Sequence, residues 1–261
     1  MNNTPVQLLA PVTSNQPVYP GVNIIWLEAP EIARIALPGQ FVMLKCEDGT
    51  FLRRPLSIHR VSTDRTRVAF MFAAVGKGTA WLAAATPRMK VDLLGPLGNH
   101  FEIDPDIEAA VVVAGGLGVA PLAFLADELK IRGKKISFLY GAATAGQLCP
   151  EPFLPEMNEY ILATEDGSRG ERGFITACLP RYLSRPVQLF ACGPTPMYRT
   201  MAIAGEIKNM PAQVSLEVRM ACGLGICYGC TVDTRVGLRQ VCKHGPVFEL
   251  HEVRWESFPG I

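Results

Sequence analysis

Residues 109–126 read AAVVVAGGLGVAPLAFLA, and this stretch decides which fold class the sequence predicts. Eighteen residues without a charge reach the length of an apolar helix that could span a membrane. However, the glycines at 115, 116 and 118 and Pro121 would interrupt such a helix, and the valines at 111–113 favour a strand. We therefore expect a buried strand, a glycine turn and a buried helix, and no membrane-spanning segment.

The segments that follow alternate between strands and helices. Apolar strands are expected at 136–142, 160–166 and 187–193, and helices at 121–132 and 195–208. Strands that alternate with helices are typical of a parallel sheet. This part of the chain is therefore predicted to be an α/β domain of the nucleotide-binding type.

Residues 20–100 have a different pattern. Short apolar runs at 21–29, 39–46, 53–61, 67–74 and 90–95 are separated by Gly, Pro and Asp turn signals, which predicts an antiparallel β barrel or sandwich. From Pro211 onward the chain is rich in Gly and Cys. The predicted division is a β-barrel domain at 1–102, an α/β domain at 103–210 and a small C-terminal domain at 211–261.

The composition excludes several classes of protein. The 261 residues include 25 Lys and Arg against 24 Asp and Glu, so no charge excess points to nucleic acid or an anionic membrane. The hydrophobic fraction of 49% suits folded cores rather than disorder. The first residues, MNNTPVQLLAPV, lack the basic start of a signal peptide, which fits a cytoplasmic protein with reduced thiols.

Four of the eight cysteines lie in one short segment, at 222, 227, 230 and 242. Their C-x4-C-x2-C…C order matches the ligand pattern of plant-type [2Fe–2S] clusters. Glycines at 223, 225 and 229 would let the backbone wrap a cluster and aim N–H groups at its sulfurs. A zinc site usually pairs two C-x2–4-C units, and here only Cys227 and Cys230 form one. Of the remaining cysteines, Cys192 in the turn ACGP is the one candidate site residue.

Two further motifs could bind phosphate. The loop Gly115–Pro121 joins a predicted strand to a helix, and free N–H groups at a helix start attract phosphate, although such a turn can also be a packing solution. In the β region, an arginine of the pair Arg53–Arg54 could clamp a pyrophosphate, and Ser57 could donate to a ring nitrogen. Downstream, Gly76–Thr79 offers N–H groups and a hydroxyl. An edge strand with two solvated arginines, followed by an ordinary loop, is the competing interpretation.

The order of these motifs resembles that of the ferredoxin-reductase-like flavoproteins over essentially the whole chain. RPLS (54–57) and GKGT (76–79) lie in the β region, GPLGN (95–99) closes it, GGLGVAPL (115–122) opens the α/β region, ACGP (191–194) ends its last strand and the cysteine tail follows. Within that group, the chain is similar to the family of electron-transfer subunits of type 1B dihydroorotate dehydrogenases, which share GPLGN, TEDGS (164–168) and CGLGICYGC…VCKHGPVF.

The resemblance implies three cofactors and a set of residues for each. FAD would lie on the barrel against Arg54, Pro55, Leu56, Ser57, Met71, Phe72, Ala73, Gly78 and Thr79. NAD would lie on the α/β domain against Gly115, Gly116, Gly118, Cys192 and Gly193. Ser57 at the flavin N5 edge and Cys192 at the nicotinamide are the candidates nearest the chemistry, and Cys222, Cys227, Cys230 and Cys242 would hold [2Fe–2S].

The implied function is that of an electron conduit in pyrimidine biosynthesis. Dihydroorotate would be oxidised at the FMN of a separate catalytic subunit, and the electrons would pass through the cluster and FAD to NAD+. The implied assembly is a two-fold pair of heterodimers. Two alternatives stay open: the flavin subunit of an NAD(P)H–ferredoxin oxidoreductase or a sulfide dehydrogenase, and a zinc-stabilised binding module.

The sequence also predicts a preference for NAD over NADP. A 2′-phosphate usually needs a basic residue near the end of the second strand of a nucleotide-binding domain. Residues 143–147, which follow the strand at 136–142, carry no positive charge. Arg169 and Arg172 lie beyond the next strand, among Glu165, Asp166 and Glu171.

Overall fold

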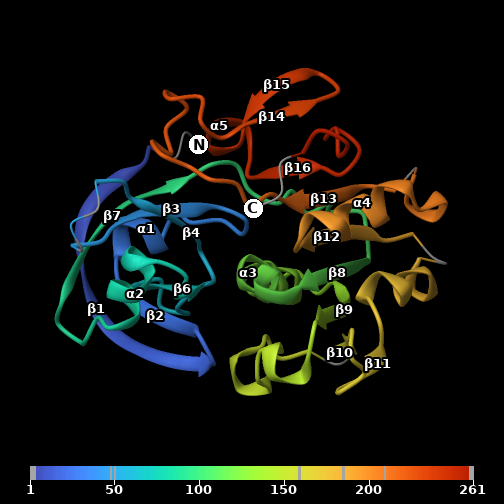
Figure 1. Cartoon of the computed structure of the whole chain (residues 1–261), viewed down its shortest axis with the longest axis horizontal. Coiled ribbons are helices and arrows are strands. Elements are labelled where there is room, and N and C mark those ends of the chain that lie inside the picture. The colour runs from blue at the N-terminus through green and yellow to red at the C-terminus, as the bar shows by residue number, and fades with distance from the viewer. Residues whose placement is uncertain are drawn as a thin grey trace.

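A computed structural model describes residues 4–47, 49, 51–157, 160–183, 186–208 and 210–258. Within these residues, the strands form two sheets of seven strands and one two-stranded hairpin. Figure 1 shows the first sheet at the left, the second at the right and the hairpin above them. Residues 1–3 and 259–261, at the ends of the predicted domains, lie outside the described part of the chain.

The first sheet is an antiparallel, curled sheet in the order β4-β3-β7-β1-β2-β6-β5. Its elements are β1 (Val6–Tyr19), β2 (Val22–Glu28), α1 (Pro30–Ala33), β3 (Phe41–Lys45), β4 (Arg54–Ser57), β5 (Arg60–Val61), β6 (Arg67–Ala73), α2 (Lys77–Ala83) and β7 (Lys90–Leu97). Its two end strands, β4 and β5, are joined by only Ile58 and His59, so the sheet curls around a core that includes Ile25, Leu44 and Phe70. The predicted barrel is confirmed.

Strand β1 has no counterpart among the predicted strands. Its first half pairs with β7 and its second half pairs with β2, so one strand joins two parts of the curled sheet. Pro11 and Pro17 lack the N–H that a strand interior normally uses, and most of β1 is only half buried, which hides its strand pattern in the sequence.

The second sheet has the order β11-β10-β9-β8-β12-β13-β16 and is parallel except for β16. Its strands are β8 (Ala109–Gly115), β9 (Lys135–Ala142), β10 (Tyr160–Thr164), β11 (Glu171–Arg172), β12 (Gln188–Cys192), β13 (Ala212–Ser215) and β16 (Val247–Glu249). Its helices are η1 (Gly116–Gly118), α3 (Val119–Ile131), η2 (Ala145–Gln147), η3 (Glu151–Phe153), η4 (Ile175–Ala177), η5 (Leu179–Tyr182), α4 (Thr195–Ile203) and η6 (Gly205–Ile207). Residues 109–126 thus form the expected strand, glycine turn and helix.

Two details differ from the expectation. The predicted helix at 195–208 ends at Ile203, because Ala204 is extended and a separate turn of helix follows it. Strands β13 and β16 lie within residues 211–261, yet both belong to the second sheet. Strand β13 reads AQVS and is too short and polar to show a strand pattern. Its Gln213 is buried because the side-chain oxygen accepts the Glu102 N–H at 2.9 Å.

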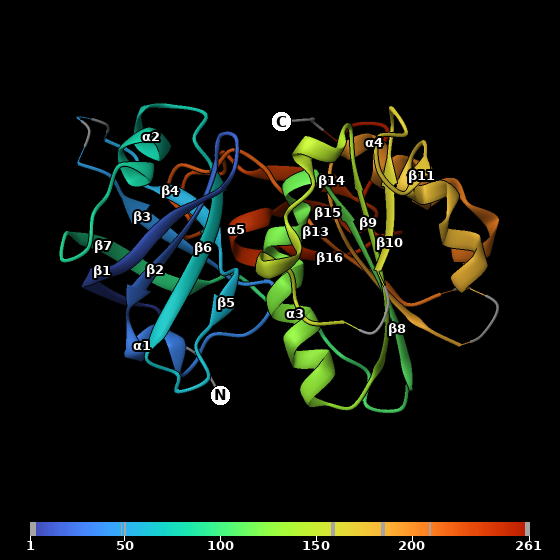
Figure 2. The ribbon, with the colours of Figure 1, turned by 90° about the horizontal axis from the view of Figure 1, so that it is seen from below.

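Helix α3 lies between the two sheets (Figure 2). Nine of its thirteen residues are buried, which explains why its first eight residues are apolar on every face. Phe124 reaches the barrel and packs within the barrel's core. No helix among the described residues is both long and apolar enough to cross a membrane.

The C-terminal segment packs over both sheets. It contains the hairpin of β14 (Thr231–Thr234) and β15 (Gly237–Gln240), followed by α5 (Val241–His244). The Asn99 side chain donates to the carbonyl oxygens of His244 at 3.1 Å and Val247 at 2.7 Å. Gly98 has a positive φ of 75°, and a Cβ there would lie 2.6 Å from the Gly245 oxygen. The motif GPLGN therefore joins the barrel to the cysteine-rich segment.

Candidate functional site

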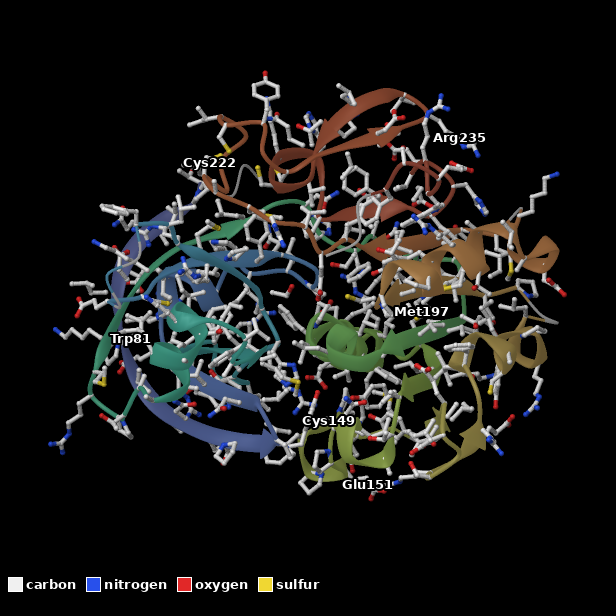
Figure 3. The ribbon with its side chains drawn as sticks, viewed as in Figure 1. Trp81, Cys149, Glu151, Met197, Cys222 and Arg235 are labelled. Atoms are coloured by element: carbon white, nitrogen blue, oxygen red, sulfur yellow. The ribbon has the colours of Figure 1, made fainter. Side chains whose placement is uncertain are left out.

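The four clustered cysteines form two pairs of close sulfur atoms. The Sγ atoms of Cys230 and Cys242 lie 3.3 Å apart, and the side chains of Cys222 and Cys227 are hydrogen-bonded to each other. Cys222 and Cys227 come from the loop before β14, and Cys242 comes from α5 across the hairpin. Two irons with two thiolates each need this arrangement, so the donor set fits a [2Fe–2S] cluster. Figure 3 shows Cys222 at the barrel side of the segment.

Backbone N–H groups surround these sulfur atoms. Those of Leu224 and Ile226 each lie 3.4 Å from Cys222 Sγ, and that of Gly225 lies 3.1 Å from Cys242 Sγ. N–H groups that point at thiolate sulfur stabilise negative charge and tune the potential of a cluster. The loop therefore has the donors that the glycine-rich sequence predicts.

The surroundings shift the pKa values of two of these thiols in opposite directions. Desolvation opposes ionisation of Cys222, but N–H donation from Leu224, Cys227 and Ile226 lowers its pKa to about 6. Desolvation and the neighbouring Cys230 raise the pKa of Cys242 to about 12. Since metals bind thiolates, loading of metal at Cys242 must displace its proton.

Two glycines let the loop approach its neighbours. Gly223 and Gly225 have φ values of 70° and 74°. A Cβ on Gly223 would lie 2.6 Å from the Met43 side chain, and a Cβ on Gly225 would lie 2.8 Å from the Lys243 side chain.

In the part of the chain that the structure describes, no three Cys, His, Asp or Glu side chains converge as ligands of one metal ion.

On the barrel, Arg54 lies against the start of α2. A Cβ on Gly78 would be 2.7 Å from Arg54 Nε and 3.0 Å from Cζ, so the guanidinium occupies the space that glycine leaves open. The Thr79 hydroxyl accepts the N–H groups of Val75 at 3.0 Å and Gly76 at 3.1 Å, which fixes the turn before the helix. A guanidinium beside a helix start can clamp a pyrophosphate.

Arg53 points elsewhere and has a structural role. Its guanidinium forms two hydrogen bonds with the Asp92 carboxylate, at 2.7 and 3.0 Å, and donates to the Met43 and Asp92 carbonyls. The arginine side chain is 19% exposed. Arg53 immediately precedes β4 and Arg54 is its first residue, and adjacent residues of an extended chain face opposite ways, so the two arginines serve different partners.

The other residues that the resemblance assigns to FAD lie on β4 and β6, which contact each other. Arg54, Pro55, Leu56 and Ser57 are all half buried, so β4 presents accessible surface. Met71 and Phe72 have buried side chains and Ala73 is half buried, so their backbone is the part that could meet a ligand.

The glycines of the loop between β8 and α3 divide into two kinds. A Cβ on Gly118 would lie 2.0 Å from the Cys192 oxygen, and one on Gly115 would lie 2.7 Å from the Pro194 ring. These two glycines pack the loop against the end of β12. Gly116 has a φ of 54°, and a Cβ there would meet nothing within 4 Å. Gly116 is therefore the open position, at the carboxyl edge where such sheets bind nucleotides.

Cys192 is fully buried at the end of β12. Desolvation raises the pKa of its thiol well above the usual range. The neighbouring Tyr198 hydroxyl accepts the Gly193 N–H at 2.9 Å and donates to the Ser215 oxygen at 2.7 Å. The structure thus brings Cys192 and Gly193 beside Gly115 and Gly118, as the resemblance implies for one site.

Sequence reasoning missed Glu217, which follows β13. The residue as a whole is exposed to solvent, yet the surrounding protein desolvates its carboxyl group, which raises the pKa of that group. The carboxylate also acts electrostatically on the Cys192 thiol. No local pattern identifies Glu217, because its proximity to Cys192 depends on the pairing of β12 with β13.

At the far edge of the second sheet, Arg169 is engaged by an acidic partner. Its guanidinium lies 2.9 Å from Glu151 Oε1, and Glu151 lies at the lower edge of the molecule in Figure 3. The Arg169 backbone exchanges two hydrogen bonds of 2.9 Å with the Thr164 hydroxyl at the end of β10. Glu151 and Arg169 border a small pocket that Leu148, Cys149 and Tyr160 also line.

Three comparisons relate this chain to known proteins. Residues 217–254 match the model of a family described as the iron-sulfur cluster binding domain of dihydroorotate dehydrogenase B. A dihydroorotate dehydrogenase B (NAD(+)) electron transfer subunit from Desulforamulus reducens is 36% identical over 92% of this chain and 95% of its own. The corresponding subunit from Geobacillus kaustophilus is 39% identical over 83% of this chain and 86% of its own.

Solved structures share the fold of this chain. The structure of an NADH-dependent reduced ferredoxin-NADP oxidoreductase has a TM-score of 0.86 at 27% identity and covers 98% of this chain and 92% of its own. Phthalate dioxygenase reductase, at 16% identity and a TM-score of 0.64 over 88% of this chain and 87% of its own, shares the fold. The relatives, the cluster-binding segment and the two-sheet architecture together place this chain in the family of electron transfer subunits of dihydroorotate dehydrogenase B (NAD(+)).

Proposed function

We propose that this chain carries electrons between a catalytic subunit that oxidises dihydroorotate at FMN and NAD+. The proposal rests on the two close pairs of cysteine side chains, Cys222 with Cys227 and Cys230 with Cys242, within the matched segment at 217–254. The bound groups supply the redox chemistry, since a [2Fe–2S] cluster carries single electrons whereas FAD exchanges a hydride with NAD. The chain's own residues bind these groups and set their spacing.

On the barrel, we assign FAD binding to the accessible face of β4 and the start of α2. The Arg54 guanidinium beside Gly78 would hold a pyrophosphate, whereas Arg53 is engaged by Asp92. Ser57 ends β4 on the same strand and would face the flavin edge. The Met71–Ala73 backbone would complete the site.

On the second sheet, we assign NAD binding to the edge formed by Gly116 and Gly193. Gly115 and Gly118 support this edge by close packing against residues 192–194, so the loop is preformed. The N–H groups at the start of α3 favour a pyrophosphate there. The Glu151 carboxylate beside Arg169 disfavours a 2′-phosphate, which supports NAD over NADP.

The catalytic subunit is proposed to dock on the face that carries the cluster. Cys227 is exposed there, and its neighbours Ile226 and Tyr228 are 71% and 69% exposed. Leu238 on β15 is also 71% exposed. Exposed large apolar side chains around a cluster ligand mark an interface with another protein. We further propose that two such heterodimers form a two-fold symmetric heterotetramer.

Co-purification with the catalytic subunit tests the function. The complex should reduce NAD+ with dihydroorotate, and Cys227→Ser should abolish this reaction and the paramagnetic signal of the reduced cluster. FAD content and flavin reduction by NADH should be unchanged. Cys178→Ala is the matched control, because Cys178 is a buried thiol outside the cluster segment. An unchanged cluster signal in Cys227→Ser would remove Cys227 from the ligand set.

The docking face has its own test. Ile226→Glu should weaken capture of the catalytic subunit and leave the cluster spectrum intact. Ile203→Glu is the matched control, since Ile203 is 85% exposed on α4, outside the cluster segment. Equal capture by both variants would exclude this face. The mass of the intact complex by light scattering tests the heterotetramer.

A ferredoxin–NAD(P)H oxidoreductase is the second candidate, because the structure of the NADH-dependent reduced ferredoxin-NADP oxidoreductase matches almost the whole chain. The curated relatives favour the dihydroorotate dehydrogenase subunit. Ferredoxin-dependent NAD(P)+ reduction without dihydroorotate activity in the complex would favour the second candidate. Metal and sulfide analysis separates both from a zinc-stabilised module, which would contain zinc and no acid-labile sulfide.

A further inference from the structure

Two polar residues that follow β4 link the barrel to helix α3, beside the apolar contact of Phe124. His59 is 1% exposed, and its Nδ1 lies 2.8 Å from the carbonyl oxygen of Ala120 in the first turn of α3. Arg60 Nε lies 3.1 Å from Asp127 Oδ2, two turns further along the same helix. His59 therefore links the barrel to α3 in the interior, and Arg60 links them nearer the surface.

The chemistry of the His59 contact sets the direction of the hydrogen bond. A carbonyl oxygen can only accept, so Nδ1 carries the proton and donates it. Within the described residues, the buried Nε2 atom has no hydrogen-bond partner. A leucine would fill similar space without leaving such an atom, so packing alone does not account for an imidazole here. The hydrogen bond to Ala120 is the function that the polar ring performs.

On the barrel side, His59 is rigidly connected to the strand assigned to FAD. Its own N–H donates to the Ala69 oxygen at 2.8 Å, and the Ile58 N–H donates to the Gln40 oxygen at 3.0 Å. Ser57, the last residue of β4, directly precedes these two anchored residues. A shift of the His59 backbone relative to Ser57 would require the loss of these hydrogen bonds, and burial confines the ring itself.

On the other side, Ala120 is rigidly connected to the loop assigned to NAD. Gly118 lies two residues before Ala120, and its backbone packs directly on the Cys192 carbonyl. The loop cannot move relative to β12 without opening this contact. One side-chain hydrogen bond thus joins the Ser57 end of β4 to the glycine loop.

We propose that His59 is a positioning residue for hydride exchange, and that it holds the start of α3 and the glycine loop in register with the Ser57 end of β4. The inference rests on the proposed function, because it assumes that NADH is oxidised by a flavin held on β4. The rate of such a reaction is sensitive to small displacements of the reacting groups, of the order of 1 Å.

Three variants at this position separate the hydrogen bond from packing. In His59→Asn, the amide nitrogen takes the place of Nδ1 and can still donate to Ala120. In His59→Gln, the donor moves one bond further out, and in His59→Leu it is absent. All three are tested in the FAD-loaded full chain by stopped-flow reduction with NADH, and by hydrogen exchange of the amides at 116–124.

We expect His59→Leu and His59→Gln to slow flavin reduction by about tenfold or more at saturating NADH, with the NADH concentration for half-saturation and the FAD content little changed. Amide exchange at 116–124 should increase in the same two variants. His59→Asn should restore both readouts to near the parent values. If His59→Leu does not fold, the comparison of Asn with Gln carries the test.

Unchanged reduction rates and exchange in His59→Gln would overturn the inference, as would equal defects in Asn and Gln. If the parent protein itself is not reduced by NADH, the proposed function fails. The exchange measurement then still decides whether His59 holds the glycine loop.

Discussion

Gly78→Ala should weaken FAD binding without unfolding the barrel, because the added methyl group competes with Arg54 for space. The new Cβ would lie 2.7 Å from Arg54 Nε and 3.0 Å from both Cζ and Nη2. Gly78 is the second residue of α2, and alanine is favoured over glycine in helices by up to about 1 kcal/mol, so the helix itself tolerates the change. The guanidinium at the end of a flexible side chain must move away.

The magnitude follows from what the displaced guanidinium loses. A hydrogen bond to a charged group contributes about 1.5–3 kcal/mol, so FAD affinity should fall by roughly ten- to a hundredfold. Titration of the apoprotein with FAD, followed by flavin fluorescence, measures the affinity, and thermal unfolding measures stability. Gly205→Ala, in η6 of the other domain and with no atom within 4 Å of its new Cβ, is the matched control.

A double-mutant cycle tests the mechanism directly. If Gly78→Ala acts through the guanidinium, the variant Arg54→Ala/Gly78→Ala should bind FAD no more weakly than Arg54→Ala alone. Additive losses of affinity in the double variant would refute this reasoning, as would a Gly78→Ala variant with the affinity of the parent protein.

Arg53→Ala should lower the free energy of unfolding by about 2 kcal/mol, because it breaks the Asp92 pair and two hydrogen bonds to carbonyls, and it should leave FAD affinity within about threefold of the parent value. Urea unfolding and the same FAD titration check this, and equal FAD loss in Arg53→Ala and Arg54→Ala would contradict it. The parent complex should have a higher kcat/KM for NADH than for NADPH, and Glu151→Gln should reduce the ratio of the two values because it releases Arg169. A higher kcat/KM for NADPH in the parent complex would contradict the assignment of NAD as the nucleotide. Burial, together with the nearby charge of Arg60, lowers the pKa of His59 to about 3. Below pH 6.5 the unfolded chain therefore binds a proton at His59 that the folded chain does not bind. Acidification from pH 7 to pH 5 should lower the free energy of unfolding of the parent protein by about 2 kcal/mol more than that of His59→Asn. Identical pH dependence of urea unfolding in the two proteins would exclude this.

The sequence by itself determined the features that depend on short-range order. The spacing of Cys222, Cys227, Cys230 and Cys242 predicted a cluster-type donor set, because three ligands on one loop are near each other in any compact fold of that loop. The stretch at 109–126 predicted its strand, turn and helix, since β-branched residues and glycines act locally.

The tertiary structure alone decided which distant segments meet. Strands β1 and β13 have weak patterns in the sequence, and their place in the sheets comes from pairing with strands far along the chain. The proximity of Glu217 to Cys192 and the hydrogen bond from His59 to Ala120 likewise join residues far apart in the sequence. Periodicity and propensity describe the environment of one segment at a time, whereas these contacts depend on how whole layers pack, so no local pattern encodes them.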